Sequence, residues 1–279
     1  MILDGKKIAE KIYTEIRKKI AENEKKPGLG VILVGDNPAS ISYINQKRKF
    51  AELVGMNFYL KHFEENTSED ILMEEIESLN NRDDIDGFIV QLPLPKYIHE
   101  QRVIDTIDPK KDVDGFTKEN IGKLFLSEEN GLISCTPKGI KKLLDEYDIG
   151  LKGKNVTIIG KSNIVGKPLS LLFINHAATV TVCDIFTKNL DEHTLKSDIV
   201  VSAAGVANLI NENMIKPGTV VIDVGFNFVD GKVMGDCDFI GLEKDNYITP
   251  VPGGVGPMTV AMLIENTYLA FLNKNEGTN

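Results

Sequence analysis

A chain of 279 residues, 42% hydrophobic and 26% charged, is long enough for one large globular domain or two ordinary ones with separate cores. Its net charge of −9 at pH 7 argues against a nucleic-acid-binding surface, which needs a basic stripe to neutralise phosphates. Its three cysteines and four histidines lack disulfide or metal-ligand spacing, which argues against structural bridges and a metal site and favours a reducing cytoplasm.

The N-terminal region predicts a short strand followed by an amphipathic helix that reaches about residue 20. This region lacks the apolar core of a signal peptide, and no later segment approaches the ~18 apolar residues of a membrane span. We therefore expect neither a secretory leader nor a transmembrane helix.

The first half of the chain alternates between strands and helices. Asn37 supplies an N-cap and Pro38 a first-turn proline for one of these helices. Such alternation implies parallel strands joined by right-handed crossovers. The pattern predicts strands at 28–35, 57–63 and 85–91, and helices at 38–54 and 67–79.

A second cycle of strands and helices follows from residue 155 to residue 234. It predicts strands at 155–160, 179–183, 198–202 and 219–224, a helix at 167–176, and a hairpin at 226–234 that turns at Asp230-Gly231. We expect two α/β domains, one formed by residues 1–117 with the C-terminal helix 258–279, and a Rossmann-type domain at 118–257. One stripe of this C-terminal helix is expected to dock on the first domain, through Val260, Leu263, Ile264, Thr267, Tyr268 and Phe271.

Residues 249–259 contain three prolines and three glycines among eleven positions. Prolines fix φ and glycines free it, so the composition predicts a rigid loop that is neither helix nor central strand. A loop with few side chains lets the backbone touch a flat ligand, although an ordinary connection has the same composition.

A glycine-bounded turn at 160–166 lies between a predicted buried strand and a helix. Rossmann domains bind dinucleotide phosphates at this position, against the N–H groups of the helix start. The turn is not a GxGxxG motif, because Ser162 replaces the second glycine and Gly166 comes one residue late. A plain strand–turn–helix connection is the alternative, and the strands that follow favour nucleotide binding.

Three polar groups in the first half are candidates for chemistry. Tyr43 and Lys47 are four residues apart, so they share one helix face. Gln91 ends a buried strand, where α/β sheets present groups to ligands. Asp114 precedes a glycine in the segment 112–115. Each has a simpler explanation taken alone: a solvated pair, an edge cap and ordinary turn chemistry.

Taken together, these segments resemble the bifunctional methylenetetrahydrofolate dehydrogenase/methenyltetrahydrofolate cyclohydrolase family. The Asp-Val-Asp-Gly and Pro-Gly-Gly-Val-Gly-Pro-Met-Thr blocks are the most specific, and the matching segments keep the family order over nearly the whole chain. In chain order they are 34–40 with Tyr43 and Lys47, 90–95, 111–116, 134–139, 160–166, 221–225 and 250–259.

The resemblance implies that folate binds in a cleft between the two domains. Tyr43 would stack on the pterin-side rings, Lys47 and Gln91 would flank the reacting carbon, and Asp114 would bind the amino edge of the pterin. The other implied folate contacts are Val90, Leu92, Pro252, Gly253, Gly256 and Pro257. The implied nucleotide contacts are Gly160, Lys161, Ser162, Ile164, Val165, Asp184, Ile185 and Phe226.

The implied reactions are oxidation of 5,10-methylenetetrahydrofolate by NADP⁺ and hydrolysis of the methenyl product to 10-formyltetrahydrofolate. They belong to one-carbon metabolism and purine biosynthesis, need no metal, and imply a homodimer paired through the nucleotide domain. Hydrolysis requires a base, and Lys47 is the candidate. Its ordinary pKa of about 10.4 must then be lowered by desolvation and by the cationic substrate.

One segment departs from the family pattern, because Ile185 replaces a residue that helps to hold the 2′-phosphate of NADP. Asp184 is an acid at the end of a strand, where it can accept the ribose 2′-hydroxyl of NAD and repel a phosphate. Lys161 matches a position that can pair with the 2′-phosphate. We expect NADP as cofactor, with NAD as the alternative.

Two other functions stay open at the level of sequence. A shikimate-type dehydrogenase also combines a lysine-bearing α/β domain with a Rossmann domain, but it does not explain residues 250–259. A nucleotide-binding regulatory or scaffold protein could keep the fold without turnover, although Lys47, Gln91 and Asp114 together argue against that. From the length of 279 residues we expect no formyltetrahydrofolate synthetase domain.

Overall fold

The computed structural model describes residues 1–276, which form two compact units. We call them the three-stranded unit, Glu10–Cys135 with the chain from Val260 onward, and the five-stranded unit, Met1–Ala9 with Thr136–Thr259. The division differs from the expected boundary at Thr117.

Hydrogen bonds explain the shift of this boundary. The side chain of Asn120 bonds to Pro109 O and to Asp112, which ties residues 118–135 to the three-stranded unit. At the other end, Leu3 N donates to Ile248 O over 2.8 Å, so the first residues extend the five-stranded unit.

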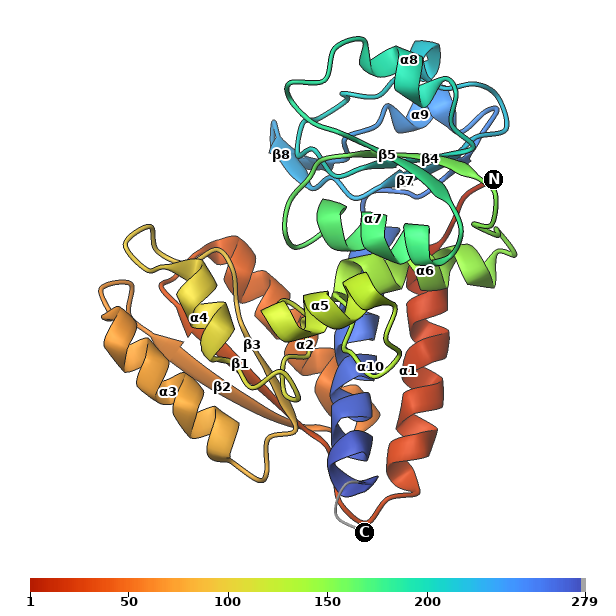
Figure 1. The fold of residues 1–279 in the computed structure, drawn as a ribbon. Helices are drawn as coiled ribbons and strands as arrows, with labels where there is room; N and C mark the ends of the chain where they lie inside the picture. The colour runs from red at the N-terminus through yellow and green to blue at the C-terminus, as the bar shows by residue number, and fades with distance from the viewer. Residues whose placement is uncertain (277–279) are drawn as a thin grey trace. The chain divides into compact units, whose positions relative to one another are not determined.

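The three-stranded unit contains a parallel sheet in the order β2-β1-β3, as the alternating pattern predicts (Figure 1). Asn37 caps the helix after β1 by accepting N–H groups from Ala39 and Ser40, which confirms that start signal. The strands are β1 (Gly28–Val34), β2 (Asn57–Phe63) and β3 (Gly87–Val90). The helices are α1 (Gly5–Ala21, shared with the other unit), α2 (Pro38–Val54), α3 (Glu69–Asn81), α4 (Glu100–Thr106) and α5 (Lys118–Leu126).

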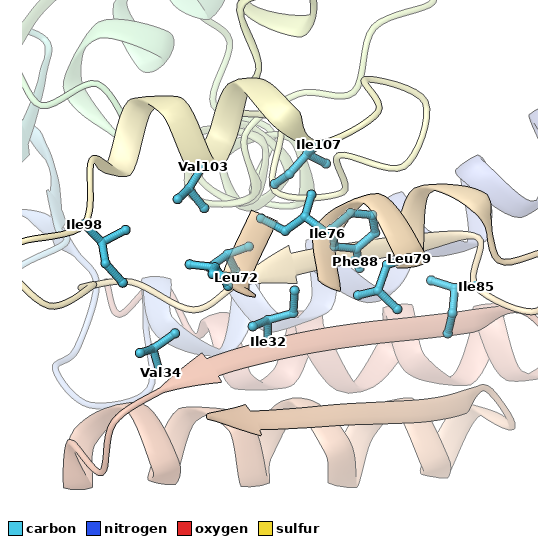
Figure 2. Close-up of a cluster of buried hydrophobic side chains, with 11 residues drawn as sticks. Ile32, Val34, Leu72, Ile76, Leu79, Ile85, Phe88, Ile98, Val103 and Ile107 are labelled. Atoms are coloured by element: carbon cyan, nitrogen blue, oxygen red, sulfur yellow. The ribbon is translucent and has the colours of Figure 1, made fainter. Parts of the chain in front are cut away.

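The core of this unit explains why β1 is a continuous apolar run. Every residue of β1 is buried, so both faces of the strand are covered and no polar alternation remains. Figure 2 shows side chains from α3 and α4 packed over Ile32, Val34 and Phe88 on one face of the sheet.

The five-stranded unit contains a parallel sheet in the order β10-β7-β6-β4-β5. The hairpin turns at Asp230 and Gly231, both with positive φ, as predicted. The sheet strands are β4 (Asn155–Ile159), β5 (Thr179–Cys183), β6 (Ile199–Ser202), β7 (Val220–Asp223) and β10 (Tyr247–Ile248). The remaining elements are α6 (Cys135–Glu146), α7 (Gly166–Asn175), α8 (Leu190–Thr194), the 3₁₀ helix η1 (Glu212–Met214), the hairpin β8 (Asn227–Val229) and β9 (Lys232–Met234), and α9 (Phe239–Leu242).

The order of these strands creates a topological switch point between β4 and β6. The chain leaves β4 toward β5 on one side and returns to β6 on the other. In open parallel sheets, ligands bind outside the carboxyl ends of the strands at such a point. The segments that follow these two strands begin at Gly160 and Ala203.

Helix α10 (Val255–Glu276) corrects two expectations. Residues 255–259 form its first turn, so this part of the Pro/Gly segment is helical. Pro257 is tolerated there because the first N–H groups of a helix have no intrahelical acceptor. Burial also extends beyond the expected stripe, since Ala261 and Met262 are fully buried as well.

Among residues 1–276, Val255–Asn275 is the one helix that passes a test of length and composition for a membrane span. Two thirds of its most apolar window (67%) is buried inside the protein. Such burial is typical of a core helix, which passes the same test of length and hydropathy.

Candidate active site

Lys47 and Gln91 are brought together in the three-stranded unit. Lys47 Nζ donates to Gln91 Oε1 over 2.9 Å, from helix α2 to the residue that follows β3. The Gln91 amide in turn donates to Leu92 O over 2.7 Å, which orients its oxygen toward the amine. Removal from water lowers the pKa of Lys47, while the charges of Asp114 and Cys135 oppose this shift.

Tyr43 precedes Lys47 by one helical turn and lies on the same side of α2. Its side chain is partly buried, and desolvation raises the pKa of its hydroxyl, so the ring stays neutral. The predicted pair therefore combines an aromatic ring with a desolvated amine.

Asp114 is the acidic member of this site. Burial raises its pKa to about 6, and the nearby Asp112 acts in the same direction, whereas Lys47 and a hydrogen bond with Cys135 lower it. An acid and a base whose pKa values move toward neutrality in the same place are a common signature of a catalytic site.

Asp112 has a different role from Asp114, although the two lie in one motif. Its carboxylate is 1% exposed and satisfies the N–H groups of a tight turn. The four donors are Gly115 N, Phe116 N, Thr117 N and Asn120 Nδ2, at 2.7–3.1 Å. Asp112 thus holds the backbone that carries Asp114 in place.

Gly115 is required by the same turn. Its φ is +72°, and a Cβ there would come within 2.6 Å of Ser134 N. A larger residue would be strained both by its backbone conformation and by this close approach.

Two side chains that the sequence analysis missed also fix this segment. Asn266 on α10 is fully buried and donates to Val113 O and Ile133 O, both over 2.9 Å. Cys135 Sγ donates to Val113 O over 3.2 Å and faces Asp114. The Ser-Cys-Thr-Pro block was a local signal for Cys135, whereas Asn266 lies far away in sequence and had none.

The other expected folate contacts are distributed unevenly. Val90 is 5% exposed and belongs to the hydrophobic core, so only its backbone is available to a ligand, whereas Leu92 is partly exposed. The remaining expected contacts belong to the five-stranded unit and have partly or fully exposed surfaces: Pro252, Gly253, Gly256 and Pro257.

The glycine turn after β4 has the geometry of a nucleotide site. A Cβ at Gly160 would lie 2.3 Å from Ala203 O, and one at Gly166 would lie 2.0 Å from Gly160 O. Only glycine permits both approaches, which bring the start of α7 against the end of β4. Ser162 Oγ accepts Val165 N over 3.1 Å and orders the turn, while Ile164 is partly exposed there.

The end of β5 carries the expected specificity residues. Asp184 forms an ion pair with Lys161, and this hydrogen bond lowers the pKa of the carboxyl group. The Lys161 ammonium also lies 5.9 Å from the centre of the Phe186 ring. Ile185 is 92% exposed, and Phe226, before the hairpin, is 53% exposed.

Comparison with known proteins agrees with this arrangement. Residues 3–114 match the model of the tetrahydrofolate dehydrogenase/cyclohydrolase catalytic domain, and residues 134–275 match that of the NAD(P)-binding domain. The bifunctional protein FolD of Hydrogenobaculum sp. (strain Y04AAS1) is 54% identical over 97% of this chain and 98% of its own length. The chain belongs to the tetrahydrofolate dehydrogenase/cyclohydrolase family.

Members of this family act in folate one-carbon metabolism, and this chain is a bifunctional methylenetetrahydrofolate dehydrogenase and methenyltetrahydrofolate cyclohydrolase. The FolD enzyme of Campylobacter jejuni has a TM-score of 0.96 at 45% identity, covering 98% of this chain and 99% of its own. The sequence-based prediction of family and fold is confirmed.

Three further structures bear on the cofactor and on the rival function. A Trypanosoma brucei FolD complexed with NADP and an inhibitor is 35% identical, with a TM-score of 0.95 and 98% coverage of both chains. The NAD-dependent 5,10-methylenetetrahydrofolate dehydrogenase of Saccharomyces cerevisiae is 25% identical, with a TM-score of 0.83 and coverage of 99% and 98%. Shikimate 5-dehydrogenase of Thermus thermophilus, at 12% identity, a TM-score of 0.55 and coverage of 87% and 99%, shares the fold alone.

The two aspartates of the motif should differ in their effect on stability. Asp112→Ala should lower the free energy of unfolding by about 3 kcal/mol, because it leaves buried N–H groups without an acceptor. Asp114→Ala should change it by less than about 1 kcal/mol at pH 7, because the fold already disfavours the ionised carboxylate. Urea denaturation of both variants measures the difference.

A pH series provides the control for this pair. Because the folded state raises the pKa of Asp114 to about 6, ionisation of this group costs stability as the pH rises from the unfolded pKa to the folded one. The unfolding free energy of the wild type minus that of Asp114→Ala should therefore fall between about pH 4 and pH 6 and level off above. A difference that rises over this range would contradict the assignment.

Proposed function

We propose that the protein oxidises 5,10-methylenetetrahydrofolate with NADP⁺ and hydrolyses the methenyl product at one site centred on Lys47. The observation that carries the proposal is the 2.9 Å hydrogen bond from Lys47 Nζ to the uncharged Gln91, in surroundings that lower the pKa of the amine. Asp114 provides the carboxylate of this group, at the side expected to bind the pterin.

The oxidation step depends on orientation. When bound, the nicotinamide supplies the acceptor for a hydride from the bridging carbon. Such a transfer needs no base, so the protein contributes mainly by holding the folate in one position. Tyr43 stacks on the pterin-side rings in this proposal, and Gln91 borders the reacting carbon with its oriented amide.

The hydrolysis step needs a base, and Lys47 supplies it. The oxygen of a water molecule adds to the methenyl carbon while Lys47 Nζ accepts the proton that the water loses. The hydroxyl of this adduct then loses its proton as the bond from the carbon to N5 breaks and N5 takes up a proton, which leaves the formyl group on N10. A cationic substrate beside the amine disfavours its ammonium form further, and Gln91 orients the amine without a charge that would restore that form.

Substrate recognition falls to Asp114 in this proposal. With a pKa of about 6 the carboxyl group is mostly ionised at pH 7, so it accepts the two N–H groups at the amino edge of the pterin. The backbone of Val90 and Leu92 adds contacts in the same unit. The other proposed folate contacts are Pro252, Gly253, Gly256 and Pro257.

We propose NADP rather than NAD as the cofactor. Asp184 stands at the strand end where an acid favours the 2′-hydroxyl of NAD, and its lowered pKa keeps it ionised. Lys161 pairs with this carboxylate and offsets its charge. The same ammonium group can also bind a 2′-phosphate, which favours NADP. The other proposed nucleotide contacts are Gly160, Ser162, Ile164, Val165, Ile185 and Phe226.

We also propose that the enzyme is a cytoplasmic homodimer that serves purine biosynthesis. Strand β5 is an edge of the five-stranded sheet; Val182 in this strand is 43% exposed, and Ile174 on the neighbouring helix α7 is 53% exposed. An exposed edge strand with apolar neighbours favours pairing with a second copy. The three cysteines are buried thiols outside any disulfide within the described residues, which suits a reducing compartment.

Substitution of the base should separate the two activities. Lys47→Met is expected to lower cyclohydrolase turnover by at least about 10³-fold and to retain part of the dehydrogenase activity, because hydride transfer requires no base. Lys49→Met, an exposed lysine on the same helix, serves as the matched control and should leave both activities unchanged. Formation and decay of the methenyl absorbance measure the two steps. Equal losses in Lys47→Met would assign this residue to binding or folding instead.

Substitution of the phosphate-pairing lysine should change cofactor preference. Lys161→Gln is expected to lower kcat/KM with NADP⁺ about tenfold or more, because it removes the cation that offsets Asp184, with less than about threefold change for NAD⁺. Initial rates with both cofactors give the ratio. A wild-type preference of tenfold or more for NAD⁺, or an equal loss with both cofactors, would contradict the proposal.

A further inference from the structure

Asp236 is a buried carboxylate that none of the proposed steps uses. It is 0% exposed and follows the β8–β9 hairpin. Its two oxygens accept hydrogen bonds from three consecutive backbone amides and two side chains. These donors are Ala204 N, Gly205 N, Val206 N, Ser202 Oγ and Asn227 Nδ2, at 2.7–3.1 Å.

Asp223, at the end of β7, holds the backbone of Asp236 in place. Its Oδ1 accepts Asp236 N and Gly225 N, both over 2.9 Å, and its Oδ2 accepts Cys237 N over 2.8 Å. Two glycines make the necessary space. A Cβ at Gly225 would come within 2.1 Å of Asp236 Oδ1, and one at Gly235 within 2.0 Å of Asp223 Oδ2.

The segment that Asp236 holds borders the glycine turn at the switch point. Ala203 N donates to Ile159 O over 2.8 Å, and Ala203 O packs directly against Gly160. Residues 203–206 lead from there to an exposed surface, where Val206 is 51% exposed. Residues 203–206 therefore follow β6, which neighbours β4, the strand that leads into the expected phosphate turn. Both segments lie at the carboxyl edge of the sheet, where nucleotides bind.

We propose that Asp236 is a positioning residue of the nucleotide site, which fixes residues 203–206 in the conformation that receives the cofactor. The inference rests on the proposed nucleotide site at the carboxyl edge of the five-stranded sheet. Because Asp236 uses the amides of 204–206, these amides are not available to phosphate groups. The phosphates are left to the turn at 160–166, and residues 203–206 shape the part of the site that holds uncharged portions of the nucleotide.

The bifunctional activity supplies an internal control for this inference. Cyclohydrolysis does not require the nucleotide, so it reports whether the protein is folded and binds folate. Asp236→Asn is expected to raise the KM for NADP⁺ at least about tenfold, because the amide NH₂ faces donors where the carboxylate accepted them. Cyclohydrolase kcat/KM and the folate KM should stay within about twofold of the wild type.

Asp198→Asn is the matched control within the same unit. Asp198 accepts Asn155 N over 2.9 Å at the amino end of the sheet, away from the carboxyl edges of the strands. Its substitution should leave the KM for NADP⁺ within about twofold. A comparable rise in both variants would show a general structural effect and overturn the inference.

Ser202→Ala is a milder second variant, which decides the question if Asp236→Asn does not fold. It removes one of the donors to Asp236 and should raise the KM for NADP⁺ about threefold with unchanged cyclohydrolase activity. An unchanged KM, or a parallel loss of both activities, would overturn the inference. Absence of either activity in the wild type would instead contradict the proposed function.

Discussion

The site depends on the removal of one ammonium and one carboxylate from water in the same place. Desolvation lowers the pKa of Lys47 and raises that of Asp114, and their mutual attraction opposes both shifts. Both pKa values therefore move toward neutrality. The hydrogen bond to Gln91 matters because it holds the amine without adding a charge. A carboxylate at that position would favour the ammonium form and would remove the base that hydrolysis requires.

Asp112, Asp236 and Asp114 are held in two different ways. Asp112 and Asp236 each accept hydrogen bonds from three backbone amides. Asp112 fixes the turn before α5, and Asp236 fixes the loop after β6. For Asp114, desolvation and the charge of Lys47 determine the pKa instead. Asp112 and Asp236 thus provide the fixed backbone on which the reactive groups lie, and two residues of one Asp-Val-Asp-Gly motif serve these different purposes.

The sequence predicted elements whose signals are local. Strands 57–63 and 179–183 and helix 38–54 match the structure, because apolar runs and the Asn37-Pro38 start lie within each element. Helices α4, α5 and α6 were not predicted, and the loop expected for the Pro/Gly segment was wrong from residue 255, where α10 begins with Pro257 in its first turn. The compact units divide at Cys135 rather than at Thr117, because the bonds of Asn120 join segments that are separate in the sequence.

For the site residues too, local signals were predictable from the sequence and tertiary contacts were not. The spacing of Tyr43 and Lys47 on one helix was readable, whereas the proximity of Lys47, Asp114 and Cys135 depends on three separate segments. Asn266 and Asp236 gave no local signal at all, since their partners are distant in the chain. The resemblance to a family supplied the grouping of residues that spacing alone left open, and the contacts supplied the physical reasons for it.

The most direct test of this account is the pKa of Lys47 in the folded protein, measured by NMR titration with ¹³C-labelled lysine side chains and assigned through Lys47→Met. The account predicts an inflection clearly below that of the exposed Lys49, moving lower still with a cationic folate analogue bound. An inflection at the ordinary lysine value of about 10.4 would show a fully solvated ammonium and would contradict the role of Lys47 as the base.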